Sequence, residues 1–305
     1  MSQLLEGVSL LPHLGVIRVE GEDAAKFLQG QLTQDFVLLG PDHARLAAFC
    51  SAKGRMQASF VGVQRSATEI VLVCSRDILA PTLKRLSMFV LRAKARLTDA
   101  TSAFGLFGLC GQSARAALPA PEAPWGMSHR TGAQVVRLYP ADGQPRALWI
   151  APAGEPPPPG ASLAPGLWLW SEVRSGVATV TAPIVEAFVP QMLNYESVGG
   201  VNFKKGCYPG QEVVARSQFR GTLKRRAFLA HCAGETAAGQ DVFHTADADQ
   251  PCGTVAQAAP APSGGWDAIV SMQVAAAEGG GLTAGSPTGE ALVLLPLPYL
   301  LMTDV

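Results

Sequence analysis

Apolar residues along the chain fall into short runs, and their spacing predicts strands interrupted by a few helices. Residues 14–20 and 45–50 are apolar runs bounded by polar residues or glycine, which is typical of strands. Residues 23–34 carry apolar side chains at helical spacing. Asp77 is expected to cap a helix that buries Leu79, Leu83, Leu86 and Val90. Further strands are expected at 55–63, 70–74, 104–109, 135–139 and 147–150, and further helices at 112–118, 172–179 and 190–197.

Turn residues divide these elements. Asp142-Gly143 predicts a tight turn that joins two strands into a hairpin. Residues 151–166 contain Glu155 followed by four prolines, which predicts a stiff surface connection inside a domain.

The pattern changes after Gly221. Short apolar strands alternate with Gly, Pro and Ala turns, and few helical periods remain. The expected strands are 227–230, 253–257, 268–274 and 291–296. This spacing predicts a small β-barrel or sandwich over residues 223–305, after a larger unit over residues 1–222.

Composition then limits the class of protein. A chain of 305 residues with 48% apolar and 16% charged residues is expected to fold into more than one domain. Its 24 Lys and Arg balance 24 Asp and Glu, which argues against a broad electrostatic grip on nucleic acid. The basic run Lys224-Arg225-Arg226 is interpreted as a solvated face. The N-terminal residues lack the features of a signal peptide and no apolar run could cross a bilayer, so we expect a cytoplasmic protein without membrane partners.

Six cysteines lie at positions 50, 74, 110, 207, 232 and 252. None forms a CxxC pair, and their spacing matches no zinc or iron–sulfur ligand pattern, so we expect no metal ligands. Cys50, Cys74 and Cys110 end apolar runs and are expected to be reduced core residues.

The segment KGCYPGQEVVAR at residues 205–216 places Cys207 between Gly206 and Tyr208, near Lys205 and before an expected helix. A nearby cation and a helix N-terminus both favour a thiolate, so Cys207 is expected to be reactive. Pro209 suits the first turn of that helix. The alternative is a loop-to-helix junction with a half-buried cysteine.

Four stretches resemble one known family: GEDAAKFLQGQLTQD at 21–35, CSAKGRMQASF at 50–60, FVPQMLNYESVGGVNFKKGCYPGQEVVAR at 188–216 and GTLKRR at 221–226. On these stretches the chain resembles the YgfZ family, the folate-binding proteins of the glycine-cleavage T-protein superfamily with its aminomethyltransferase-like fold. The resemblance implies an α+β fold: a three-lobed ring of two interleaved α+β lobes and a C-terminal small β-barrel. A central hole would receive tetrahydrofolate or a one-carbon derivative.

The resemblance also implies a set of site residues. Glu196 stands where T-protein relatives carry a pterin-binding glutamate; its alternative is an exposed helix carboxylate. A carboxylate matches the two parallel donors of a reduced pterin, N3–H and the 2-amino group. The wider candidate set comprises Tyr195 and Tyr208 for stacking, Arg55, Lys204, Lys205 and Arg216 for the anionic tail, and Gln31, Asn202, Gln211 and Glu212 for polar contacts.

One departure from the T-proteins bears on activity. Ala58 and Ser59 stand where those enzymes carry acidic residues, so glycine-cleavage catalysis is disfavoured. The resemblance instead implies an accessory role in iron–sulfur cluster assembly or repair, including clusters of tRNA-modifying enzymes, with Cys207 as a reactive thiol and Lys205 beside it. Partners would be folate and transient iron–sulfur client proteins, and the protein would be a monomer.

Two alternatives stay open. A folate-dependent one-carbon transferase or demethylase is the first, and the missing acid weighs against it. Direct binding of tRNA is the second, and the zero net charge weighs against it.

Overall fold

Three β-sheets carry the fold in the computed structural model, which describes residues 4–118, 123–130, 132–219 and 223–302. The first sheet has the order β3-β4-β5-β2-β6 and is antiparallel throughout. Its strands are β2 (Leu14–Glu20), β3 (Arg45–Cys50), β4 (Met56–Ser66), β5 (Glu69–Ser75) and β6 (Arg96–Asp99). The helices of this lobe are α1 (Ala24–Gln29), the 3₁₀ turn η1 (Arg76–Ile78) and α2 (Leu79–Ser87).

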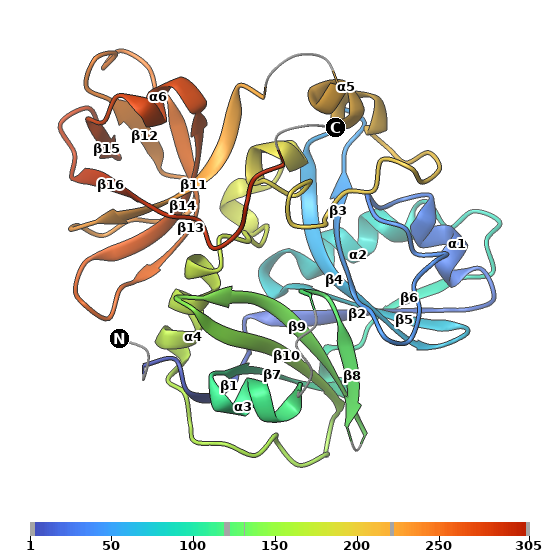
Figure 1. The fold of residues 1–305 in the computed structure, drawn as a ribbon. Helices are drawn as coiled ribbons and strands as arrows, with labels where there is room; N and C mark the ends of the chain where they lie inside the picture. The colour runs from blue at the N-terminus through green and yellow to red at the C-terminus, as the bar shows by residue number, and fades with distance from the viewer. Residues whose placement is uncertain (1–3, 119–122, 131, 220–222, 303–305) are drawn as a thin grey trace.

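The second sheet has the order β1-β7-β10-β9-β8 (Figure 1). Its elements are β1 (Gly7–Leu10), η2 (Thr101–Ala103), β7 (Phe104–Cys110), α3 (Gln112–Ala117), β8 (Met127–Arg130), β9 (Ala133–Ala141) and β10 (Gln144–Pro152). Strand β1 precedes the whole first sheet in sequence, yet it pairs with β7, which follows that sheet. The two lobes are therefore interleaved, as the resemblance implied.

The expected hairpin is confirmed. It joins β9 to β10, and Asp142 and Gly143 have φ values of 51° and 74°. Two successive positive φ angles are the geometry of the type I′ turn, which matches the twist of the paired strands.

The third sheet is a closed barrel, β11-β14-β13-β12-β15-β16. Its elements are β11 (Arg225–Cys232), β12 (Asp241–His244), β13 (Gly253–Pro260), β14 (Trp266–Gln273), α6 (Val274–Glu278), β15 (Leu282–Ala284) and β16 (Ala291–Leu295). The barrel prediction is confirmed. The division at residue 222 stays a prediction, since residues 220–222, with part of the GTLKRR stretch, lie outside the described residues.

Helix α4 (Pro165–Arg174) joins the lobes, because it packs against β13 and β14 of the barrel and against β9. It buries Trp168, Trp170 and Val173. The helix expected at 172–179 is misplaced: Pro165 fits a first helical turn, whereas Gly176 has φ of 68°, which ends the helix.

The helix expected at 190–197 is also wrong. The short 3₁₀ turn η4 (Pro190–Leu193) occupies the start of this region, after the separate turn η3 (Ala182–Ile184), and Asn194 follows η4 in the left-handed conformation with φ of 58°. Asparagine tolerates that conformation better than most residues do. The consequence is that Glu196 lies on an irregular segment rather than on a helix face.

Other expectations need smaller corrections. The helix expected at 23–34 is shorter, because only α1 (Ala24–Gln29) is helical there. Asp77 does not cap α2; its carboxylate accepts hydrogen bonds from Ser75 Oγ and Ala182 N. Helix α5 (Gln211–Phe219) begins two residues after Pro209, so that proline precedes the helix instead of opening it. The sequence pattern missed the strands β1, β6, β8, β12 and β15 and the helix α6.

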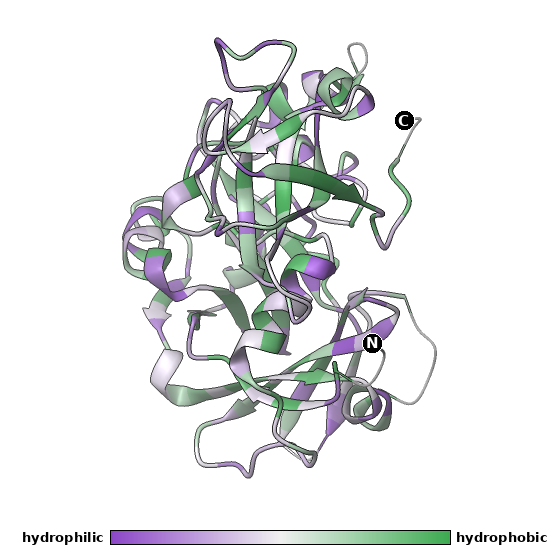
Figure 2. Ribbon diagram, turned by 90° about the vertical axis from the view of Figure 1, so that its left-hand side faces the viewer, coloured by the Kyte–Doolittle hydropathy of each residue, from purple (hydrophilic) through white to green (hydrophobic). Residues whose placement is uncertain are grey.

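One buried apolar cluster runs through all three lobes. It includes Ile17 and Phe60 of the first sheet, Ile150 of the second and Leu229 and Ile269 of the barrel. Figure 2 shows apolar residues along the strands of these sheets. In the part of the chain that the structure describes, no helix is long and apolar enough to span a membrane.

Two glycines bring the segment that contains KGCYPGQE against the first sheet. Residues 202–210, which we call the motif loop, end at Gly210, whose φ is 80°. A Cβ on Gly210 would lie 2.6 Å from Gly54 Cα and would also overlap Ser51 O. A Cβ on Gly54 would lie 2.9 Å from Val213 Cβ. The turn before β4 and the start of α5 therefore meet backbone to backbone.

Gly210→Ala is expected to destabilise the protein by about 1–3 kcal/mol, because the new methyl group meets rigid backbone and the φ angle is unfavourable for alanine. Urea unfolding would measure this. Gly206→Ala is the matched control, since no heavy atom lies within 4 Å of a Cβ at Gly206. Equal stability of the two variants would contradict the packing described here.

Candidate functional site

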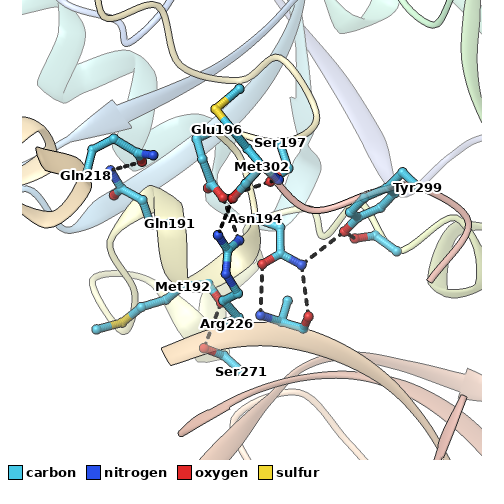
Figure 3. A network of polar contacts seen from close by, with 12 residues as sticks. Gln191, Met192, Asn194, Glu196, Ser197, Gln218, Arg226, Ser271, Tyr299 and Met302 are labelled. Carbon is cyan, nitrogen blue, oxygen red and sulfur yellow. Dashed lines mark hydrogen bonds and ion pairs between the residues drawn. The ribbon is translucent and has the colours of Figure 1, made fainter. Parts of the chain in front are cut away.

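Asn194 fixes the segment that carries Glu196 to the barrel (Figure 3). Its Nδ2 donates to Ala227 O at 2.9 Å, and its Oδ1 accepts from Ala227 N at 3.2 Å. Asn194 is fully buried, so both polar ends of its side chain need partners. The amide therefore holds β11 in a defined position against the segment after η4.

Glu196 is buried, and its two carboxylate oxygens have different surroundings (Figure 3). Oε1 accepts from Arg226 Nη1 at 2.7 Å and from Ser197 Oγ at 2.8 Å. Oε2 is buried and has no hydrogen-bond partner. The predicted alternative of an exposed helix carboxylate is therefore wrong. The structure holds one oxygen in place and leaves the other as an unpaired acceptor.

Arg226 was missed as a site residue, because the run Lys224-Arg225-Arg226 was interpreted as a solvated face. The side chain of Arg226 is only 12% exposed and that of Glu196 is 0% exposed, so the ion pair is shielded from water. The one available signal was the position of Arg226 inside the GTLKRR stretch.

A cavity of about 80 Å³ lies between the two sheets and α4. Tyr195 and Ser59 line it, together with Arg146 and Glu172. Ser59 Oγ accepts from Val180 N at 2.9 Å, and Ala58 is fully buried. Of the two positions that were expected to lack a catalytic acid, Ser59 therefore lines this cavity with a hydroxyl group, whereas Ala58 is not one of its lining residues.

Tyr195 and Tyr208 were both expected to stack on a ligand, and the structure places both in the interior. Tyr195 is fully buried and donates from its hydroxyl to Ala178 O at 2.6 Å. Tyr208 is 7% exposed. Burial raises the pKa of each phenol. Tyr195 keeps contact with the cavity, whereas Tyr208 supports the motif loop.

Lys205 anchors the motif loop to the first lobe. Its Nζ donates to Leu32 O at 2.6 Å and to Gln29 O, and it lies 4.7 Å from the centre of the Tyr208 ring. Burial lowers the pKa of Lys205 to about 8, although Asp35 and Cys207 act in the opposite direction. Most of the bonding capacity of this ammonium is thus directed at backbone carbonyls rather than at Cys207.

Cys207 is the exposed cysteine of the chain; Cys50, Cys74, Cys110, Cys232 and Cys252 are buried. It lies four residues before α5, and α5 begins at Gln211. Burial raises the pKa of the Cys50 and Cys74 thiols to about 12, which makes them poor nucleophiles at neutral pH. Cys207 is therefore the thiol that a partner can reach.

The remaining candidates surround the motif loop. Asn202 Oδ1 accepts from Lys204 N at 2.8 Å, and Arg55 donates to Ala187 O. The Gln31 side-chain oxygen is buried without a hydrogen-bond partner. On and beside α5, Lys204, Glu212 and Arg216 are exposed and Gln211 is half-buried.

Gln191 connects the two parts of the candidate site. It lies in η4, shortly before Glu196, and its side-chain nitrogen Nε2 donates to Val214 O at 2.7 Å. The same nitrogen lies 3.4 Å from Gln218 Oε1. Helix α5, which follows Cys207, is thereby attached to the segment that carries Glu196.

Lys205 gives the stability a specific pH dependence. Its pKa of about 8 in the folded protein is below the ordinary lysine value of 10.5, so the unfolded chain binds more protons between these two pH values. The Lys205 contribution to the free energy of unfolding should therefore increase by about 1 kcal/mol from pH 7 to pH 9. Urea unfolding at both pH values should show that Lys205→Met loses this increase.

Lys204→Met is the matched control, because Lys204 is the exposed neighbour. It should keep the pH dependence of the wild type. A stability difference between wild type and Lys205→Met that stays constant from pH 7 to pH 9 would contradict the buried position of the ammonium.

Comparison with known proteins gives a consistent assignment, although no family profile matches the chain. The tRNA-modifying protein YgfZ of Edwardsiella ictaluri is 31% identical over 305 residues, which cover 93% of this chain and 89% of the relative. The YgfZ of Sodalis glossinidius is 30% identical, covering 95% of this chain and 92% of the relative. The glycine cleavage system aminomethyltransferase T of Bartonella henselae has a TM-score of 0.70 at 16% identity, covering 98% of this chain and 88% of that one, which shows a shared fold. The chain belongs to the YgfZ family.

Proposed function

We propose that this protein binds a tetrahydrofolate at Glu196 and supports the iron–sulfur clusters of tRNA-modifying enzymes. The family relatives are named tRNA-modifying proteins, which supports a role in that process. The single observation that carries the ligand proposal is the unpaired, buried Oε2 of Glu196.

The chemistry of a reduced pterin fits this carboxylate. Arg226 and Ser197 hold Oε1, so the plane of the carboxylate is fixed before a ligand arrives. N3–H and the 2-amino group of a pterin are parallel donors that a carboxylate accepts. A buried acceptor gains more from such donors than an exposed one, because water does not compete. Bound there, tetrahydrofolate would supply a carrier for one-carbon units.

The available space sets a condition on binding. The cavity of about 80 Å³ is smaller than the roughly 300–1,000 Å³ of ordinary ligand pockets. Tyr195 lines this cavity, and its neighbour Glu196 is not one of the lining residues. A whole folate with its pterin at Glu196 therefore requires neighbouring segments to move apart.

Cys207 is the second functional group in the proposal. It is exposed on a loop that Lys205, Tyr208 and Gly210 hold rigidly, so a client protein can approach the thiol without unfolding the loop. Among the described residues there is no group of three or more His, Cys, Asp and Glu side chains that could hold a metal ion. In our proposal the cluster is cargo, and Cys207 contacts it while the client supplies the other ligands.

The transferase alternative remains the weaker proposal. Ser59 faces the cavity with its hydroxyl bonded to Val180 N, and a hydroxyl is a poor general base at neutral pH. Consumption of a methylamine donor together with tetrahydrofolate, above a control without enzyme, would favour this alternative.

Cys207→Ala should abolish support of client enzymes and leave the fold intact, since the side chain is exposed. The measurement is the level of thiolated tRNA nucleosides in a bacterial strain that lacks its own YgfZ and carries the variant. We expect the level of the empty-vector strain. Cys252→Ala, which removes a buried barrel cysteine, controls for cysteine loss in general. Wild-type thiolation by Cys207→Ala would refute the role of the thiol.

Tetrahydrofolate at 100 times its Kd should stabilise the protein by about 2.7 kcal/mol, which corresponds to roughly 4 °C in Tm for a chain of this size. Glu196→Gln should lose the shift, because the amide replaces one acceptor by a donor and removes the charge. Glu186→Gln, at an exposed glutamate, is the matched control and should keep it. An equal Tm shift in Glu196→Gln would place the ligand elsewhere.

A further inference from the structure

Residues 297–302, which we call the strap, follow β16 and contain no helix or strand. The strap leaves the barrel and passes over the segment that carries Glu196, as the red chain in Figure 1 and the close view in Figure 3 show. Its position is set by two groups of contacts, one at Tyr299 and one at Met302.

Tyr299 attaches the strap to the centre of the molecule. Its hydroxyl donates to Gly176 O at 2.7 Å and lies 3.3 Å from Asn194 Nδ2. The ring packs edge-on against Tyr139, with 5.4 Å between the centroids. A Cβ on Gly176 would lie 2.9 Å from the Tyr299 ring, so the absence of a side chain at that position makes room for the ring.

Met302 attaches the strap to the Glu196 site itself. Arg226 Nη2 donates to Met302 O at 2.8 Å, and Met302 N donates to Ser197 Oγ at 2.9 Å. Arg226 and Ser197 are also the two residues that hold Glu196 Oε1. Met302 and the carboxylate of Glu196 therefore bind the same two side chains.

With the strap in this position, one oxygen of the Glu196 carboxylate has no hydrogen-bond partner. Glu196 Oε2 is buried without a hydrogen bond, and a buried carboxylate oxygen without a partner is energetically unfavourable. Outward movement of the strap opens the surroundings of this carboxylate to water or to donors on a ligand. Leu300 is 93% exposed, so its side chain does not oppose the movement, and the packing that must be released is that of Leu297 and Tyr299 against the buried apolar cluster.

We propose that the strap is a displaceable cover of the Glu196 site, which closes over the carboxylate and leaves it when tetrahydrofolate binds. The inference rests on the proposed folate function and adds a mechanism that regulates folate binding. The ligand binds only the open form, so its apparent affinity decreases as the closed fraction of molecules increases. Tyr299 and Met302 are the residues that set this fraction.

Tyr299→Phe tests the proposal, because it removes the hydroxyl contacts with Gly176 and Asn194 and keeps the ring. Loss of a hydrogen bond that holds the closed form should raise the association rate of tetrahydrofolate and lower its Kd, each about two- to tenfold. Stopped-flow binding in anaerobic buffer measures both. Leu300→Ala, in the exposed middle of the strap, is the matched control and should bind as the wild type does.

Hydrogen exchange on the full wild-type chain gives an independent readout. Exchange in the peptide that contains residues 297–302 should become faster in saturating tetrahydrofolate, since Met302 N loses its bond to Ser197. Binding by the wild type with unchanged strap exchange, and with unchanged kinetics in Tyr299→Phe, would overturn the cover and leave the folate site standing. Absence of binding in both wild type and Tyr299→Phe would overturn the folate site and the cover together.

Discussion

The ion pair between Glu196 and Arg226 is the contact on which the arrangement of the molecule around the candidate site depends. It joins the irregular segment after η4 to the first barrel strand, beside the hydrogen bonds from Asn194 to Ala227. Removing one partner of such a shielded pair generally costs about 3–5 kcal/mol, because the other charge stays buried. The pair is thus part of the barrel attachment, and it also fixes the carboxylate in the orientation that leaves Oε2 unpaired.

In the motif loop, most residues hold the loop in place, and one residue, Cys207, is exposed to solvent. Lys205 binds carbonyls of the first lobe, Tyr208 is buried beneath that ammonium, and Gly210 permits the close approach of the turn at Gly54. Three of the motif residues therefore have structural explanations that require no ligand. Cys207 is exposed among them, so a fixed scaffold presents one accessible thiol. Gln191 then connects the helix behind that thiol to the segment of Glu196, which gives the two parts of the site a common support.

The sequence pattern predicted the strands and turns that can be recognised from their own residues alone. Leu14–Glu20 and Arg45–Cys50 form strands with the expected bounds, and Asp142-Gly143 forms the expected turn. Strand β1 was missed because its four residues are stabilised by pairing with β7, which a local pattern does not contain. The resemblance supplied the interleaving of the lobes that periodicity alone does not encode.

The candidate site was also predicted only in part, because some of its contacts join residues that are far apart in the sequence. Glu196 was singled out by its place in the family stretch, whereas its partner Arg226 lies thirty positions later, in a run that resembled a solvated face. Burial of Arg226 results from how the barrel sits against the lobes, and so does the contact of Tyr299 with Gly176. The expected helix at 190–197 failed because Asn194 adopts a left-handed conformation that its two bonds to β11 stabilise. The ligand roles of the site residues stay predictions.

The most direct test of the account is a crystal structure of the full chain with tetrahydrofolate. We predict that N3–H and the 2-amino group of the pterin lie within hydrogen-bond distance of the Glu196 carboxylate, with Oε2 accepting at least one of them. Arg226 should keep its bond to Oε1. A bound tetrahydrofolate whose pterin has no contact with Glu196, while Oε2 remains unpaired, would contradict the central claim.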